Sequence, residues 1–507
     1  MENKFPHKSL LPKPLQWSLG LLTIAVIFKL FNQLHADYDL WWHIFMGNEI
    51  IIKGTLDKFD VYSFTAYGLP YINHEWLSEI IMAWTYLVGK SSGLLIWRWS
   101  MALVILYLAF RLIRLKTQHP VARIIILLCF SLVLSPGISF RVQLFSYVLF
   151  LALLLLIYSA HINDLLPSVF VVSLLFVVWA NVHGAFCLGL LIWFFYVTRY
   201  ACQYGTNVKW QRILLYFLLP ASATFINPFG TKLWQFIFHE ISNPLSQKHI
   251  TEWQRFSFAP REMPFFCVMT LTWMATFFSK RKTEATETII LIIASLMGLI
   301  SVRHTPLFVI LTLPSLSSHM ESAFLRLLKR AGHGNQVSSI LTYISSILFV
   351  GLSMLFIQMG LPDKWEVTVG KDPLPSQTIA FLEKNRVKGN LWVPLHYGGY
   401  VLFHLYPDIK VSIDGRWAMV YPRQTMQDNM TFAFQGTKGK WKQLLEKYGA
   451  DLAIVETGNP AMKEMDQDAD WIWIFSEKIG NLLIKKEYLS SLRQPLKIPH
   501  SQPPSWP

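Results

Sequence analysis

Long apolar runs recur through the first 360 residues of the chain, and they constrain its fold more than any other feature. A helix of about 20 apolar residues can cross a lipid bilayer, and a slightly shorter one suffices when its flanking side chains reach the interface. Eleven such runs lie near residues 16–34, 94–113, 122–136, 143–160, 166–180, 185–199, 211–226, 263–279, 286–301, 304–318 and 338–358. The sequence therefore predicts an α-helical polytopic membrane domain of about eleven spans over residues 1–359.

Charge and composition agree with a membrane protein. Of the 507 residues, 53% are hydrophobic and 15% are charged, whereas a soluble chain of this length would carry more charge. The formal net charge of +14 could suit nucleic acid, but the basic residues gather at the ends of apolar runs, as in Arg111–Lys116 and Lys280–Lys282. Such clusters set membrane topology, so no nucleic-acid partner is expected.

The basic clusters also predict an orientation. The run from Trp17 to Leu34 lacks a small-residue cleavage site, so we expect an anchor with a cytoplasmic N-terminus. The run from Trp76 to Val88 is short, and we interpret it as an interfacial helix because every basic loop then falls on the inner side. In a cell inner (plasma) membrane, the loop 35–93 and the chain after residue 360 would then be extracytoplasmic.

The chain after about residue 363 has a different pattern. Short strands and amphipathic helices alternate there, which predicts a small C-terminal α/β extracytoplasmic domain over residues 360–490. Residues 491–507 are rich in proline and are expected to form a disordered tail.

An acidic pair follows the first span directly. Asp37 and Asp39 are two residues apart, so both carboxylates can point the same way in an extended loop. They could share a divalent cation or divide the roles of base and metal ligand, with Asp39 as the ligand. Two solvated loop acids explain the pair equally well. His43 follows Asp39 by one helical turn and is a candidate for substrate contact.

A second polar group opens the interfacial helix. His74 and Glu75 could orient a leaving group or bind a metal, and Glu79 lies one turn further on the same face. The alternative is ordinary acidity at a helix start, where the helix dipole favours carboxylates. We take Glu75 as a catalytic candidate and His74 as a substrate contact.

Further polar residues lie at the predicted outer ends of the spans. One such residue would be a helix cap or a snorkelling group, but several on one face indicate a shared site. Guanidinium groups bind phosphate through two hydrogen bonds, so Arg303 and Arg141 are candidates for the phosphate of a lipid headgroup. The substrate-contact candidates at this rim are Arg141, Asn181, His183, Glu252, Arg303 and His304.

Two motifs stand out in the C-terminal part. His396–Tyr400 contains a Gly-Gly pair between a predicted strand and a helix, which is typical of a turn or of a backbone anion site. Asp414 and Arg416 follow a predicted strand, where α/β domains often present functional residues. They are substrate-contact candidates, and a turn with an ion pair is the alternative.

The acidic pair after the first of many spans, together with a C-terminal outer domain, resembles the GT-C class of integral-membrane glycosyltransferases. The more specific resemblance is to a bacterial group of that class with the patterns D-x-D-x-W-W-H, D-x-[FY]-S-x-T, H-E-W-L, W-x-N-x-H-G, N-P-x-G, G-G-Y and D-G-R. These patterns stand here at Asp37–His43, Asp60–Thr65, His74–Leu77, Trp179–Gly184, Asn227–Gly230, Gly398–Tyr400 and Asp414–Arg416. The resemblance covers about residues 16–486.

The resemblance implies a transferase that uses a polyprenyl-phosphate-linked sugar donor on the non-cytoplasmic face, with a divalent cation (magnesium or manganese) in some members. Its partners would be the lipid bilayer, the donor and a lipid or glycan acceptor. Transfer needs a base for the acceptor hydroxyl and a cation for the departing phosphate. We assign these roles to Asp37 and Arg303, with Asp39 as a second acid or metal ligand.

Two other classes remain open at this point. A transporter or flippase of a lipid-linked or glycan substrate would need polar groups near the bilayer midplane and often shows repeat symmetry. This chain concentrates such groups at one rim. A non-catalytic membrane scaffold is the second alternative, and substitution of Asp37 would leave its partner binding intact.

Overall fold

The computed structural model describes residues 12–204, 209–241, 250–330, 339–369, 374–434, 439–492 and 496. Contacts divide the chain into two compact units, which we describe separately. The helical unit contains Met1–Leu34, Leu95–Gly230 and Asn243–Trp365, and the mixed unit contains His35–Leu94, Thr231–Ser242 and Glu366–Pro507. The first large loop, which was predicted with the membrane domain, thus makes its contacts with the C-terminal part. The predicted disordered tail lies almost wholly outside the described residues.

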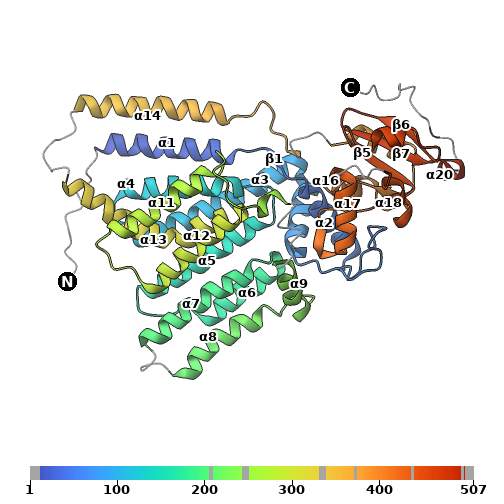
Figure 1. Ribbon diagram of the computed structural model, residues 1–507. Coiled ribbons are helices and arrows are strands. Elements are labelled where there is room, and N and C mark those ends of the chain that lie inside the picture. Colours follow the sequence, from blue (N-terminus) through green and yellow to red (C-terminus); the bar gives the residue numbers. More distant parts are fainter. Residues whose placement is uncertain are drawn as a thin grey trace. The chain divides into compact units, whose positions relative to one another are not determined.

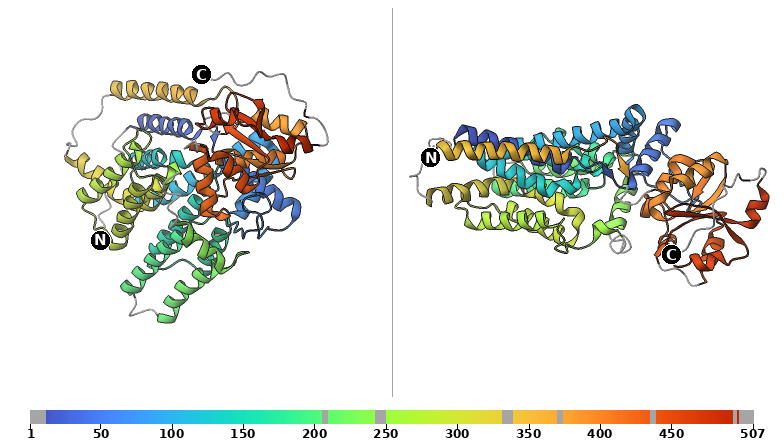
Figure 2. Two further views of the ribbon diagram at one scale, coloured as in Figure 1. Left: turned by 45° about the vertical axis from the view of Figure 1, so that its right-hand side comes forward. Right: turned by 90° about the horizontal axis from the view of Figure 1, so that it is seen from above.

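The helical unit consists of helices that run side by side (Figure 1, Figure 2). Each of the eleven predicted spans coincides with a helix, because a backbone in lipid must satisfy its hydrogen bonds within the segment. The helices are α1 (Lys13–Phe31), the second part of α3 (Trp76–Lys116), α4 (Pro120–Leu134), α5 (Gln143–His161), α6 (Val169–Val182), α7 (Phe186–Tyr204), α8 (Trp210–Ala223), α11 (Met263–Phe278), α12 (Ala285–Ile300), α13 (Thr305–Arg330) and α14 (Ser339–Gly360). Short 3-10 turns η1 (Ser135–Gly137), η2 (Thr251–Trp253) and η3 (Val302–His304) lie between them.

The number of strongly apolar helices is smaller than the number of predicted spans. Six described helices are long and apolar enough to cross a membrane, and α6, α11 and α12 are shorter apolar helices. The membrane domain therefore has about six to nine apolar helices. The helices α8 and α13 account for the difference from eleven, and each contains an internal proline, Pro220 and Pro314.

The first and last helices of this unit pack along each other (Figure 1). The Asn32 side-chain amide, just after α1, donates a hydrogen bond to the Gly360 carbonyl at the end of α14, at 2.7 Å. A Cβ at Gly360 would lie 3.1 Å from the Lys29 Cα, so a side chain there would make the two helices shift apart slightly.

The helix α3 is interrupted at Lys90, whose φ of 48° and ψ of −135° are not helical. The part before this break belongs to the mixed unit and coincides with the predicted interfacial helix. Beyond the break the chain turns back closely, because a Cβ at Gly93 would lie 2.0 Å from the Thr85 carbonyl oxygen. The location of the predicted interfacial helix, Trp76 to Val88, at a membrane interface stays a prediction.

The mixed unit contains a five-stranded sheet with the order β4-β3-β5-β7-β6. The strands are β3 (Gly389–Trp392), β4 (Ile409–Val411), β5 (Leu452–Glu456), β6 (Trp471–Ser476) and β7 (Gly480–Lys485). β3 pairs in parallel with β4 and β5, whereas β7 pairs antiparallel with β5 and β6. The prediction of a small C-terminal α/β region is confirmed, with a mixed sheet.

The first large loop covers the edge of this sheet. Strand β1 (His35–Ala36) pairs with β2 (Thr368–Val369) directly before the acidic pair. Further along the loop, the Phe64 N–H donates to the Val411 carbonyl at 3.1 Å, and the Thr65 hydroxyl donates to the Ser412 carbonyl at 2.5 Å. The loop thus satisfies backbone groups of the edge strand β4, which would otherwise be open to pairing.

Helices surround the sheet of the mixed unit. Apart from the first part of α3, they are α2 (Asp39–Lys53), α9 (Thr231–Ile241), α15 (Ser376–Lys384), α16 (Leu395–Leu405), α17 (Arg423–Phe434), α18 (Trp441–Tyr448), α19 (Met462–Asp466) and α20 (Lys486–Ser491), with the 3-10 turn η4 (Trp417–Met419). A core between α17, α18 and the sheet contains the buried side chains of Trp392, Trp441 and Trp471.

Candidate functional site

The acidic pair lies at the start of α2 in the mixed unit. The backbone N–H of Asp39, the first residue of α2, donates to Asp37 Oδ1 at 3.0 Å, so the Asp37 carboxylate closes a local turn directly before the helix. Both side chains are partly buried. The structure therefore holds Asp37 in place at a helix N-terminus, where the helix dipole favours a carboxylate.

Asp39 faces the D-G-R motif of the C-terminal part. A Cβ at Gly415 would lie 2.8 Å from Asp39 Oδ1 and 2.2 Å from the indole nitrogen of Trp42. A side chain at this position would displace the side chains of Trp42 and Asp39. This contact between the first and last motifs of the mixed unit was not predicted.

Three side chains from two helices form a buried cluster in the same unit. His43 of α2 lies beside Glu75 and Glu79, which flank the start of α3. His43 Nδ1 is 3.4 Å from Glu79 Oε1 and 4.0 Å from Glu75 Oε2. The three residues are 4%, 6% and 0% exposed, and one ligand atom from each lies within 4.8 Å of the others. This His/Glu/Glu cluster could hold a metal ion.

The charges in the cluster act on its histidine. Burial by itself lowers the pKa of His43, but the hydrogen bond to Glu79 and the charges of Glu75, Glu79 and Asp39 raise it above its ordinary value. The cluster therefore attracts a positive charge, either as a proton on His43 or as a cation.

Other buried groups support the cluster carboxylates. The Asn73 amide donates to Glu79 Oε2 at 2.5 Å, and His74 Nε2 lies 3.4 Å from Glu75 Oε1. Tyr71 is 1% exposed, and its hydroxyl has no hydrogen-bond partner among the described residues. Burial, followed by the charge of Glu79, raises the pKa of Tyr71. Sequence reasoning grouped His74 and Glu75 but assigned no role to Asn73 or Tyr71, because nothing in their positions along the sequence places them beside the cluster carboxylates.

The helix packing that forms this cluster depends on small residues. A Cβ at Gly47 of α2 would lie 2.0 Å from the Glu79 carbonyl oxygen, and one at Gly399 would lie 2.9 Å from the Trp42 backbone nitrogen. A Cβ at Gly398 would lie 2.0 Å from the Ile413 carbonyl oxygen. The Gly-Gly pair therefore lets α16 approach both α2 and the end of β4.

Asp414 and Arg416, which were predicted as substrate contacts, lie in a buried ion-pair network. Arg416 donates through Nε and Nη2 to Asp414 at 2.8 and 2.6 Å, and through Nη1 to Asp60 at 2.6 Å. All three side chains are fully buried, and the Tyr421 hydroxyl donates to Asp414 at 2.6 Å. Burial alone would lower the pKa of Arg416, but the two carboxylates raise it well above its usual range. This geometry matches the ion-pair alternative and joins the D-x-Y-S motif to the D-G-R motif.

The helical unit contains the predicted outer-rim residues. Arg141 pairs with Glu252 at 2.5 Å, and the Ser301 hydroxyl donates to the Glu252 carbonyl at 3.1 Å. The Arg303 guanidinium lies 5.2 Å from the centre of the Trp253 ring, and the His304 ring lies 6.1 Å from the same indole. The structure thus brings together Arg141, Glu252, Arg303 and His304.

Asn181 and His183 are tied into the surrounding backbone and helices. The Asn181 amide donates to the Ile226 carbonyl at 2.8 Å, which links the end of α6 to the end of α8. His183 Nδ1 lies 2.9 Å from the Ser146 hydroxyl, which also accepts a hydrogen bond from the Trp179 indole at 2.8 Å. These contacts fix the loop between α6 and α7.

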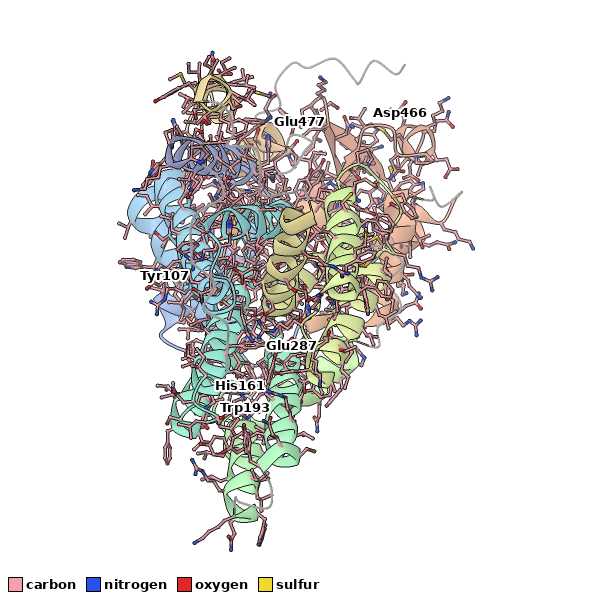
Figure 3. All side chains as sticks on the ribbon, turned by 90° about the vertical axis from the view of Figure 1, so that its left-hand side faces the viewer. Tyr107, His161, Trp193, Glu287, Asp466 and Glu477 are labelled. Atoms are coloured by element: carbon pink, nitrogen blue, oxygen red, sulfur yellow. The ribbon has the colours of Figure 1, made fainter. Side chains whose placement is uncertain are left out.

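A further ionic network lies in the helical unit, where helices α5, α7 and α12 meet. Glu287 accepts a hydrogen bond from Tyr158 at 3.0 Å and lies 3.7 Å from Lys116 Nζ. Arg199 pairs with Glu284 at 3.0 Å and lies 2.9 Å from His161 Nε2 (Glu287 and His161 are labelled in Figure 3). Each described charge here has a partner, which is typical of a structural network.

Comparison with known proteins supports the fold. No protein-family model and no curated protein matches the sequence. The oligosaccharyltransferase AglB of Archaeoglobus fulgidus, solved with an inhibitory peptide and a dolichol-phosphate, has a TM-score of 0.57 at 10% identity, over 87% of this chain and 69% of that chain. Its apo form has a TM-score of 0.53 at 10% identity, over 87% of this chain and 70% of that chain.

A mutant form of the arabinofuranosyltransferase AftD from mycobacteria has a TM-score of 0.49 at 12% identity, over 92% of this chain and 41% of that chain. At identities this low, the similarity to AglB concerns the fold. The predicted resemblance is confirmed at that level, because the chain is structurally similar to GT-C membrane glycosyltransferases over most of its length.

Proposed function

Because the chain has the fold of GT-C membrane glycosyltransferases, we propose that it transfers a sugar from a polyprenyl-phosphate-linked donor to a lipid or surface-glycan acceptor on the non-cytoplasmic face. The similarity to AglB, which was solved with dolichol-phosphate, is the observation that carries this proposal. The acidic pair at the start of α2 in the mixed unit offers carboxylates, and Arg303 in the helical unit offers a guanidinium; each is a kind of group that such a reaction needs.

Asp37 is the proposed catalytic base. In the reaction the acceptor oxygen bonds to the anomeric carbon, the bond between that carbon and the phosphate oxygen breaks, and polyprenyl phosphate leaves. The acceptor proton passes to a carboxylate. Asp37 suits this role because its position is fixed by the hydrogen bond from the Asp39 N–H. Asp39 is proposed as a second acid or as a ligand of a divalent cation, magnesium or manganese.

Arg303 is the proposed partner of the donor phosphate. Arg141 already pairs with Glu252, whereas no carboxylate in the described part of the chain lies within 4.0 Å of the Arg303 guanidinium. Packing over Trp253 orients the planar guanidinium and leaves its N–H edges for phosphate oxygens. His304 and Glu252 are proposed to border this contact.

The topology follows from the same proposal. We place the N-terminus in the cytoplasm and the mixed unit outside an inner membrane, with α8 and α13 counted among eleven spans. This orientation puts the basic loops inside, as the positive-inside rule requires.

The test compares lipid-linked sugars and surface glycans, by mass spectrometry, from cells that express wild-type protein, Asp37→Asn or Asp408→Asn at matched levels. Asp408 is a suitable control because its side chain is 45% exposed and pairs with Lys388, a residue with no proposed role in the reaction. We expect Asp37→Asn alone to accumulate one lipid-linked sugar and to lose the corresponding glycan residue. Unchanged profiles in all three strains would contradict the proposal and favour transport or scaffolding.

A further inference from the structure

We propose that His43, Glu75 and Glu79 bind one divalent transition-metal ion, zinc or manganese, inside the mixed unit. The proposal concerns metal binding and does not depend on the transfer reaction. Its three ligands are different residues from Asp39, the ligand proposed above for a divalent cation.

The geometry of the cluster suits such an ion. Ligand atoms about 2.1 Å from a tetrahedral ion lie about 3.4 Å from one another. His43 Nδ1 is 3.4 Å from Glu79 Oε1 and 4.0 Å from Glu75 Oε2, and the three ligand atoms all lie within 4.8 Å of one another. Binding would therefore draw the carboxylates closer, by up to about 1.4 Å. Three protein ligands leave at least one position for water or another oxygen.

The charges and the surrounding contacts agree with a cation. Two carboxylates and a neutral imidazole carry a charge of −2, which a divalent ion neutralises. Metal-binding carboxylates usually have hydrogen-bond partners of their own. Asn73 donates to the second oxygen of Glu79, and His74 lies 3.4 Å from the second oxygen of Glu75.

A further polar group supports a bound ligand. The Tyr71 hydroxyl is buried without a partner among the described residues. A buried hydroxyl without a hydrogen bond costs about 1–3 kcal/mol. A metal-bound water would supply the missing partner.

The kind of ligand limits the kind of metal. Magnesium and calcium prefer oxygen ligands alone, whereas an imidazole nitrogen favours transition metals. One nitrogen with two carboxylate oxygens therefore fits a divalent transition metal, of which we propose zinc or manganese. The rival explanation has no metal and places a protonated His43 between the two carboxylates.

The experiment measures the metal content of the untagged, full-length chain, purified in detergent without chelators. Elemental analysis covers magnesium, calcium, manganese, iron and zinc. The protein is then treated with a chelator and reloaded with zinc chloride or manganese chloride, and its Tm is followed by tryptophan fluorescence. The variants are Glu79→Gln and His43→Gln, with Glu49→Gln as the control, because Glu49 is a largely buried acid of α2 that pairs with Lys53 at 3.0 Å.

We expect about one zinc or manganese ion per wild-type chain, a higher Tm after reloading, and the same results for Glu49→Gln. Glu79→Gln and His43→Gln should each lose at least tenfold in metal affinity while remaining monodisperse. Wild-type protein that holds neither metal and gains no Tm on reloading would overturn the proposal and leave the protonated His43. So would a site that prefers magnesium or calcium, or variants that bind zinc or manganese as wild type does.

Discussion

Replacement of Arg416 by methionine should strongly destabilise the mixed unit. Methionine keeps an unbranched apolar stem like that of arginine but lacks the guanidinium that bonds to Asp60 and Asp414. All three side chains are fully buried, so the substitution leaves two carboxylates without a cation and without access to water. Removing one partner of a buried ion pair costs about 3–5 kcal/mol. A unit of about 150–250 residues loses about 2–4 °C per kcal/mol, which predicts a fall in Tm of about 6–20 °C.

The assay is thermal unfolding of the full chain in detergent, followed by the fluorescence of tryptophans such as Trp392 and Trp441 in the core of the mixed unit. Lys388→Met is the control, since Lys388 forms an exposed pair with Asp408, and such pairs contribute about 1 kcal/mol or less.

Combining Arg416→Met with Asp60→Asn and Asp414→Asn should restore part of the lost stability, because the buried charges are then gone. The reasoning would be refuted if Arg416→Met lowered Tm no more than Lys388→Met does.

Three other predictions concern packing, pH and the phosphate contact. Gly398→Ala should cost about 1–3 kcal/mol or more, because its Cβ would lie 2.0 Å from the Ile413 carbonyl oxygen; Gly89→Ala, with open space around it, should be nearly neutral in the same melting assay. Burial raises the pKa of Asp428, but hydrogen bonds from Lys447, Tyr448 and Gln424 lower it below the ordinary value on balance. The stability that Asp428 contributes is thus fully present above the unfolded pKa of about 3.9 and is lost as pH falls through the lower folded value. Tm-versus-pH curves of wild type and Asp428→Asn should therefore differ at pH 7 and converge in strong acid; a constant gap would contradict this. Arg303→Ala should raise the KM for the lipid-linked donor at least tenfold, with Arg303→Lys intermediate, and an unchanged KM would remove Arg303 from the phosphate contact.

Much of the fold could be predicted from the sequence, because lipid and water each impose simple constraints on a folded chain. Apolar runs in lipid have few options besides helices, and all eleven runs coincide with helices. The alternation of strands and helices after residue 363 was also readable, because short apolar runs bounded by polar residues are typical of buried strands, and β5 and β7 are buried over nearly their whole length. The helices α8 and α13 are not among the strongly apolar ones, because α8 has only 14 residues and the second half of α13 is polar.

The assembly of the mixed unit could not be predicted from local patterns. The ion pair between Asp60 and Arg416 joins residues 356 positions apart, and no spacing rule connects them. The glycines carried a signal, since Gly47, Gly398 and Gly415 all mark places where another segment leaves no room for a side chain. That signal identifies a close approach without identifying the partner.

The site residues also divide into those that local spacing reveals and those that only the packing of distant segments brings together. Asp37 and Asp39 were found from their spacing and position after the first span. The grouping of Glu79 with His43 depends on how α2 packs against α3. Because no local pattern indicates this packing, sequence reasoning gave Glu79 no role. Asp414 and Arg416 were recognised as unusual. They form a buried ion pair with each other, which explains why both charged residues occur there.

The most direct test of the transferase account uses the lipid-linked sugar that accumulates in cells with Asp37→Asn. That lipid is extracted and added, with the glycan acceptor from the same cells, to liposomes containing purified wild-type, Asp37→Asn or Asp408→Asn protein. The account predicts release of polyprenyl phosphate, measured by mass spectrometry, with wild-type and Asp408→Asn protein, and at least a hundredfold less with Asp37→Asn. Equal release by all three proteins, or none from any of them, would contradict it.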